Sequence, residues 1–155
     1  MTTFAILLCL HLCAVIFWVG GMAIMHIAVR PSAVEMLEPP QRLPFMAVTL
    51  GRFFLGVTIS IVVLLVTGAW MMHFMASVGR LPHSVEAMAG LGILMMAIFG
   101  HVRFAAFPKL RRAIAAKAWP EAGKQLGIIR QLVALNLTLG VVTVVIAIIG
   151  RTALV

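Results

Sequence analysis

Four long apolar runs constrain this chain more than any other feature of its sequence. They cover about residues 3–29, 53–78, 84–107 and 126–150, and each exceeds the roughly 20 residues that a helix needs to cross a bilayer. Only 10% of the residues are charged, whereas a soluble domain carries about 25%. Backbone groups in lipid must be hydrogen-bonded within their own segment, so each run is expected to be helical. The sequence therefore predicts an all-α integral membrane protein, folded as a single four-helix bundle.

Prolines mark the expected ends of these helices. Pro31 follows the first run, and Glu38-Pro39-Pro40 predicts a turn-rich connector to the second. Pro108 is expected to end the third helix, and residues 109–118 predict a short basic amphipathic helix on the membrane surface. The second connector is short, which predicts that the second and third helices are antiparallel neighbours.

Positive charge is distributed unevenly along the chain. Of the 12 Lys and Arg residues, only Arg80 and Arg151 lie outside the first and third connectors and their flanks. Because Lys and Arg are enriched in cytoplasmic loops, we expect both termini to lie outside the cytoplasm, which is the periplasmic side in a bacterial inner membrane. The net charge of +8 is then explained by basic stretches that face anionic lipid headgroups. Aromatic residues are not interleaved with the basic ones, so no nucleic-acid partner is expected.

The start of the chain does not read as a cleaved signal peptide. The sequence Met-Thr-Thr-Phe lacks a basic segment, and the first apolar run exceeds the roughly 7–15 residues of a signal peptide core. This helix is therefore expected to remain in the mature protein.

Five histidines lie within or beside the predicted helices, where ionisable side chains are rare and usually face the bundle interior. Their positions along the helices predict two groups at different depths. One group, in the outer half, combines His11 with His73 or His83. The other, in the inner half, combines His26 with His101.

These two groups predict haem binding. Neutral imidazoles in apolar surroundings at two depths are what two bis-histidine b-type haems require. The protein would then be a b-type cytochrome that transfers electrons across the membrane, with a quinone or another redox protein as its partner. The sequence leaves open whether the protein binds one haem or two, and whether it forms a homodimer. Cations near the inner helix ends are candidate partners of the haem propionates; these are Arg52, Arg103 and Arg130.

The 11 methionines support an alternative. Thioether and imidazole groups suit Cu(I), so the chain is also compatible with a copper transporter or copper-delivery protein. Methionine equally fills gaps in apolar cores. The clusters concerned are Met22, Met25 and His26; Met71, Met72, His73 and Met75; and Met88, Met95 and Met96.

The remaining polar residues form no enzyme motif. Asp is absent, and Glu86 lies close to His83 in sequence. Asn136 in the fourth helix is typical of an interhelical hydrogen bond. Cys9 and Cys13 are expected to be small buried hydrophobes, without a disulfide. No catalytic residue is assigned, and the one activity suggested is that of an oxidoreductase acting through haem.

Four stretches carry a resemblance that covers most of the chain. The chain resembles the copper-resistance D (CopD) family of bacterial inner-membrane proteins, which implies a four-helix inner-membrane fold and copper handling. The first helix is more weakly similar to the HemJ-type protoporphyrinogen oxidase, which implies that His11 matches a haem-binding histidine and adds a haem-dependent oxidase as a further alternative. The membrane lysine of that pattern has no equivalent here. The stretches are LHLCAVIFWVGG, LEPPQRLP, GLGILMMAIFGHVRF and KLRRAIAAKAWPEAGKQLGIIRQLV.

Overall fold

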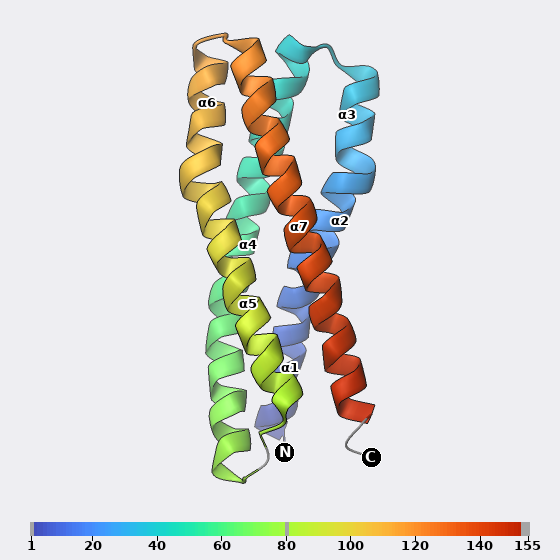
Figure 1. Ribbon diagram of the computed structural model, residues 1–155, viewed down its shortest axis with the longest axis vertical. Coiled ribbons are helices and arrows are strands. Elements are labelled where there is room, and N and C mark those ends of the chain that lie inside the picture. The colour runs from blue at the N-terminus through green and yellow to red at the C-terminus, as the bar shows by residue number, and fades with distance from the viewer. Residues whose placement is uncertain (1, 80, 153–155) are drawn as a thin grey trace.

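Four long helical rods, each apolar and long enough to cross a membrane, make up the protein (Figure 1). The structure is a computed structural model that describes residues 2–79 and 81–152, with side chains up to residue 150. The predicted all-α four-helix bundle is confirmed, and a chain of this kind requires a lipid bilayer around it. The rods are Thr2–Met36, Pro39–Ser77, His83–Ala115 and Trp119–Gly150.

The first rod continues past Pro31, so the prediction that this proline ends the helix is wrong. Pro31 stands in the first turn of α3, directly after a π-helical turn. The hydrogen-bond register changes at that point, so the missing N–H of proline is tolerated as it is at a helix start. The rod consists of α1 (Thr2–Val15), η1 (Ile16–Gly20), α2 (Gly21–Ile24), η2 (Met25–Val29) and α3 (Arg30–Met36).

The second rod, α4 (Pro39–Ser77), begins well before the predicted residue 53. Pro39 and Pro40 lie in its first turn, where the N–H groups have no partner within the helix and proline therefore costs little. The predicted turn-rich connector shrinks to Leu37 and Glu38. Residues 39–52 thereby extend the rod at the basic end of the bundle.

The third rod likewise runs through its proline, and the prediction that Pro108 ends it is wrong. It consists of α5 (His83–His101), η3 (Val102–Ala106) and α6 (Phe107–Ala115), with Pro108 in the first turn of α6. The predicted surface helix is thus not a separate element. One side of α6 buries Leu110 and Ala113 and packs along the fourth rod, while Arg111 and Arg112 stay exposed.

The fourth rod, α7 (Trp119–Thr152), exceeds the predicted 126–150 at both ends. It packs along α5 and α6, and α1 packs along α4. Although α4 and α5 run antiparallel as predicted, they touch each other much less than either touches its main partner. The core lies in the middle and basic half, where Phe54 packs edge-on to Phe99 and Phe107 at ring-centroid distances of 5.6 and 5.2 Å.

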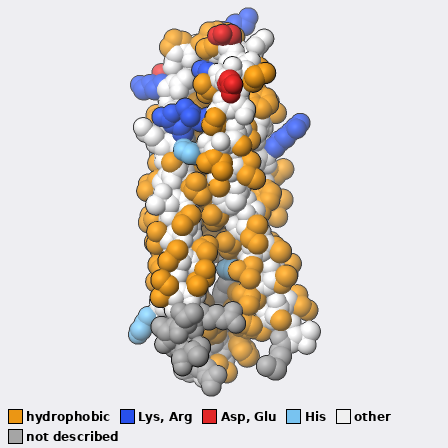
Figure 2. All heavy atoms as spheres, turned by 90° about the vertical axis from the view of Figure 1, so that its right-hand side faces the viewer, with side chains coloured by type: hydrophobic (Ala, Val, Ile, Leu, Met, Phe, Trp, Pro, Cys, Tyr) orange, Lys and Arg blue, Asp and Glu red, His pale blue; other side chains and the backbone are white. Residues whose placement is uncertain are grey.

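Toward the termini the bundle separates into two helix pairs. Phe4 of α1 packs on Phe74 of α4, and Ser84 of α5 lies against Gly150 of α7. Neither α5 nor α7 has extensive contact with α1, and no side chain in residues 83–94 or 141–150 is buried. Figure 2 shows a furrow between two columns of apolar side chains in this half, and Lys and Arg side chains gathered at the opposite end.

The outer surface of the rods is apolar, as a lipid environment requires. Ile27 and Phe104 are 71% and 78% exposed. Cys9 and Cys13 are also exposed, so the prediction that they are buried is wrong. They lie on the side of α1 away from α4, because the face with His11 makes the contact with α4.

Close approach of α7 to the other rods depends on Gly140, which gives a first test of the packing. A Cβ atom at this position would lie 2.9 Å from Cγ2 of Val19 and 3.3 Å from Cε of Met95. Gly140→Ala is therefore expected to lower the free energy of unfolding by about 1–3 kcal/mol, measured by denaturant titration in detergent micelles. Gly127→Ala is the matched control on the same helix, because no atom lies within 4 Å of its Cβ position. Equal stability of the two variants would contradict this packing.

Candidate functional site

A cavity at the basic end brings together side chains from the first, second and fourth rods. We call it the methionine–arginine cavity. Its donors include the buried Met25 and Met46 and the half-buried His26. Its full lining is Met25, His26, Arg30, Met46, Leu50, Leu126, Ile129, Arg130 and Val133.

The π-helical turn η2 positions two of these donors. Met25 and His26 are consecutive residues of η2, and both line the cavity. Met25 opens the π-helical turn, where the backbone hydrogen bonds span five residues. Met46 reaches the cavity because α4 extends through residues 39–52. No sequence pattern indicated Met46, since those residues were expected to be a connector.

Positive charge surrounds the mouth of this cavity. Arg30 and Arg130 line it, and the charges of Arg130 and Arg42 both act on Arg30. Of the three cations predicted to pair with haem propionates, Arg130 lines this cavity. The other two predicted cations lie elsewhere: Arg52 is exposed on α4, and the Arg103 guanidinium lies 5.8 Å from the Phe107 ring centroid.

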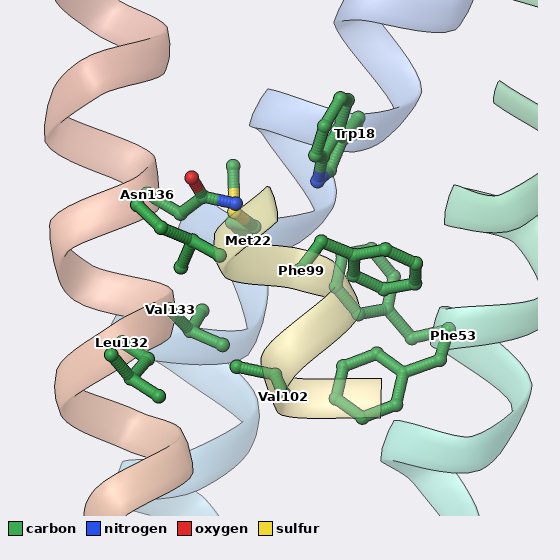
Figure 3. Close-up of a pocket in the computed structure, with 10 residues that line it drawn as sticks. Trp18, Met22, Phe53, Phe99, Val102, Leu132, Val133 and Asn136 are labelled. Carbon is green, nitrogen blue, oxygen red and sulfur yellow. The ribbon is translucent and has the colours of Figure 1, made fainter. Parts of the chain in front are cut away.

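A second cavity, which we call the aromatic cavity, lies next to the first in the middle of the bundle, and Val133 lines both. Figure 3 shows Trp18, Met22, Phe99 and Asn136 around it. Asn136 donates from Nδ2 to the backbone carbonyl of Met95 at 3.2 Å, which confirms the predicted interhelical hydrogen bond. Within the described residues its buried Oδ1 atom has no hydrogen-bond partner. A buried amide oxygen of this kind is available to a bound water or ligand.

The geometry of His11 defines which of its nitrogens can bind a ligand. Its Nδ1 lies 2.8 Å from Oγ1 of Thr67. The single hydroxyl proton of Thr67 is donated to the carbonyl of Val63 at 2.6 Å, so Nδ1 of His11 must be the protonated donor. In the neutral imidazole, Nε2 then carries the lone pair that a metal would need, and Thr67 holds the ring as an outer partner does in metal sites.

Gly68 is part of the same arrangement. A Cβ atom there would lie 3.3 Å from Cε1 of His11, so the glycine gives the imidazole room against α4. Neither Thr67 nor Gly68 was identified from the sequence. A hydroxyl residue beside a glycine is too common in membrane helices to single out a site.

The other predicted histidines lie apart from one another. His73 and His101 are exposed on α4 and α5, and His101 does not line the cavity that contains His26. His83 is exposed and pairs with Glu86 at 3.0 Å. No hydrogen bond joins His11 to either outer candidate, and no cluster of three or more His, Cys, Asp or Glu forms among the described residues. The two bis-histidine pairs therefore stay predictions.

Four buried methionines belong to the hydrophobic core. Met22, Met25, Met46 and Met95 are all less than 10% exposed and belong to one connected cluster. Met22 lies one helical turn before Met25 and lines the aromatic cavity. Met36, in contrast, is 76% exposed. The structure thus separates the buried methionines from those that face outward, which the sequence alone did not.

Comparison with protein families gives a match to a membrane protein family. The family model described as copper resistance protein D (CopD) matches residues 47–149, which is well over half of the chain. The match begins within α4 and runs nearly to the end of α7, so it includes Arg130 and Asn136 but not His11 or His26. No curated protein and no solved structure matches the chain.

Proposed function

From the premise that this chain belongs to the CopD family, whose name denotes copper resistance, we propose that it handles copper by binding Cu(I) inside its helix bundle. The observation that carries the proposal is the meeting of Met25, His26 and Met46 at one cavity. Two thioethers and an imidazole are the soft and borderline donors that favour Cu(I) over harder cations. The family and the four spans indicate a bacterial inner-membrane protein.

Exposure of the lining residues indicates where the ion would lie. Met25 and Met46 are 8% and 4% exposed, whereas Arg130 is exposed and Arg30 half-buried. The arginine charges oppose a cation at the mouth of the cavity, so the bound ion is proposed to lie among the thioethers. Met22 lines the neighbouring aromatic cavity, and we propose that it extends the ion's path toward the middle of the membrane. The basic end is proposed to face the cytoplasm, in line with the distribution of Lys and Arg.

Competition for Cu(I) tests this function directly. The full chain, purified in detergent under reducing conditions, is titrated with Cu(I) in the presence of a chromogenic Cu(I) chelator. We expect the protein to withdraw Cu(I) from the chelator up to one ion per chain. A protein that leaves all Cu(I) on the chelator, at concentrations where other thioether sites compete, would contradict the proposal.

A second candidate function is supported by a different observation at the other end of the bundle. His11 holds an imidazole with an unprotonated Nε2 in the half where the two helix pairs separate. We propose that this nitrogen ligates a b-type haem, with His73 or His83 as the opposite ligand and His26 with His101 as the inner pair. Bound haem would supply one-electron chemistry, with a quinone or another redox protein as partner. One haem with an open face would instead favour the oxidase alternative.

The visible spectrum of the purified protein tests this second function. Reduced-minus-oxidised difference spectra and the pyridine haemochrome assay are expected to show b-type haem at one or two per chain. A colourless protein, after expression with adequate haem supply, would remove the haem candidate and leave the copper proposal unaffected. A protein that contains haem but does not retain Cu(I) would support the haem candidate and contradict the copper proposal.

A further inference from the structure

Arginines from two rods line the methionine–arginine cavity, and a third arginine lies near one of them. Arg30 begins α3, Arg130 belongs to α7, and both line the cavity. Arg42 of α4 is close enough that its charge acts on Arg30, as does that of Arg130. Three like charges brought together by the fold repel one another, so folding alone does not favour this arrangement.

Among the described residues, none of these three arginines forms an ion pair with an acidic side chain. The ion pair found among the residues that the structure describes joins His83 to Glu86. That pair lies at the opposite end of the bundle. Glu121 of α7 is instead the acceptor of a hydrogen bond from Gln125. The arginine cluster therefore has unused donors and an uncompensated charge, which together suit an anion. Arginine guanidinium groups bind phosphate oxygens with paired hydrogen bonds.

The rest of the cavity wall is apolar. Its lining includes the apolar side chains of Leu50, Ile129 and Val133, and the space, which opens to the surface, measures about 30 Å³. A free phosphate ion would gain nothing from such a wall. An amphiphile, with a phosphate beside the arginines and hydrocarbon chains along the exposed apolar surface of the rods, matches both features.

We propose that the methionine–arginine cavity binds an anionic phospholipid, with its phosphate held by Arg30 and Arg130 and with Arg42 as a third nearby charge. The lipid would enter from the leaflet at the basic end of the bundle. Its negative charge offsets the repulsion among the arginines, so the bound lipid also stabilises the contact of α3 and α4 with α7. The phosphate would lie beside the arginines at the mouth of the cavity, and a Cu(I) ion would lie among the buried thioethers of the same cavity.

Native mass spectrometry of the full chain measures this binding. The protein is delipidated in a neutral detergent and supplied with phosphatidylglycerol or phosphatidylcholine at equal mole fraction. We expect phosphatidylglycerol to be retained at least about tenfold more strongly, since each nearby Lys or Arg favours an anionic lipid by about 1 kcal/mol. The double variant R30Q/R130Q is expected to lose this preference. R111Q/R112Q, which removes the same charge from the exposed side of α6, is expected to keep it.

Three outcomes would overturn the proposal. Equal retention of the two lipids by the unmodified chain would exclude a specific anionic site, and this result does not depend on any variant folding. Equal loss in the two double variants would mean that general surface charge attracts the lipid. Displacement of phosphatidylglycerol by excess inorganic phosphate would assign the cavity to free phosphate. Melting temperatures of the variants in phosphatidylcholine check that they remain folded.

Discussion

Replacing Met25 and Met46 together by leucine is expected to weaken Cu(I) binding by at least about 100-fold. The substitution removes two of the three proposed donors and leaves His26 alone, which cannot hold Cu(I) in a closed site. Leucine is close to methionine in volume, so each exchange should cost less than about 1.5 kcal/mol of stability. The measurement is the chelator competition described above, performed on the double variant and on each single variant.

Met36→Leu is the matched control for this experiment. Its side chain is 76% exposed and lies outside both cavities, so the variant loses a thioether without losing a proposed ligand. We expect its Cu(I) affinity to equal that of the unmodified protein. If M25L/M46L kept full affinity, the ion would have to bind elsewhere, and the outer methionines Met71, Met72 and Met75 would become the next variants to measure.

His11→Gln is expected to remove the outer haem entirely. The change deletes the nitrogen that Thr67 positions, while glutamine stays polar and of similar size. Thr67→Val should act through His11: it removes the acceptor of the Nδ1 proton and is expected to lower haem affinity about 10–100-fold. Thr67→Ser restores the hydroxyl and is expected to recover most of the affinity. Haem per chain is measured by pyridine haemochrome after identical purification.

A second threonine provides the control for Thr67. Thr143 of α7 also donates to the carbonyl four residues back, at 2.8 Å from Leu139, and it makes no bond to a histidine. Thr143→Val should therefore leave haem content unchanged. Full haem content in His11→Gln, in a protein that does bind haem, would show that another histidine is the ligand. His73→Gln and His83→Gln then identify which outer histidine binds.

The copper and haem predictions can be separated in the same set of variants. Met25 and Met46 line a cavity at the basic end, whereas His11 contacts α4 in the half near the termini. M25L/M46L is expected to leave haem content unchanged, and His11→Gln is expected to leave Cu(I) affinity unchanged. A variant that lowers both haem content and Cu(I) affinity would indicate that the fold is lost, and not that one ligating side chain is missing.

The sequence by itself determined the class of the protein. Length and hydropathy of the four apolar runs fixed the number of spans, because insertion into a bilayer depends on each segment separately. The uneven distribution of Lys and Arg marked one end of the bundle as basic. Polar residues isolated in apolar helices were also informative: Asn136 forms the expected interhelical hydrogen bond, and Glu86 contacts its neighbour His83.

The tertiary structure decided which residues meet. Helices that are apolar all round carry no polar stripe to define which face turns inward, so Cys9 and Cys13 could not be assigned to lipid, nor Met46 to the cavity of Met25. Pro31 and Pro108 were expected to end helices, but each stands in the first turn of a helical segment that follows a π-helical turn. Pairings such as His11 with Thr67 depend on the rotation and depth of two helices relative to each other. That relation is set by packing between rods, and no local pattern in either segment encodes it.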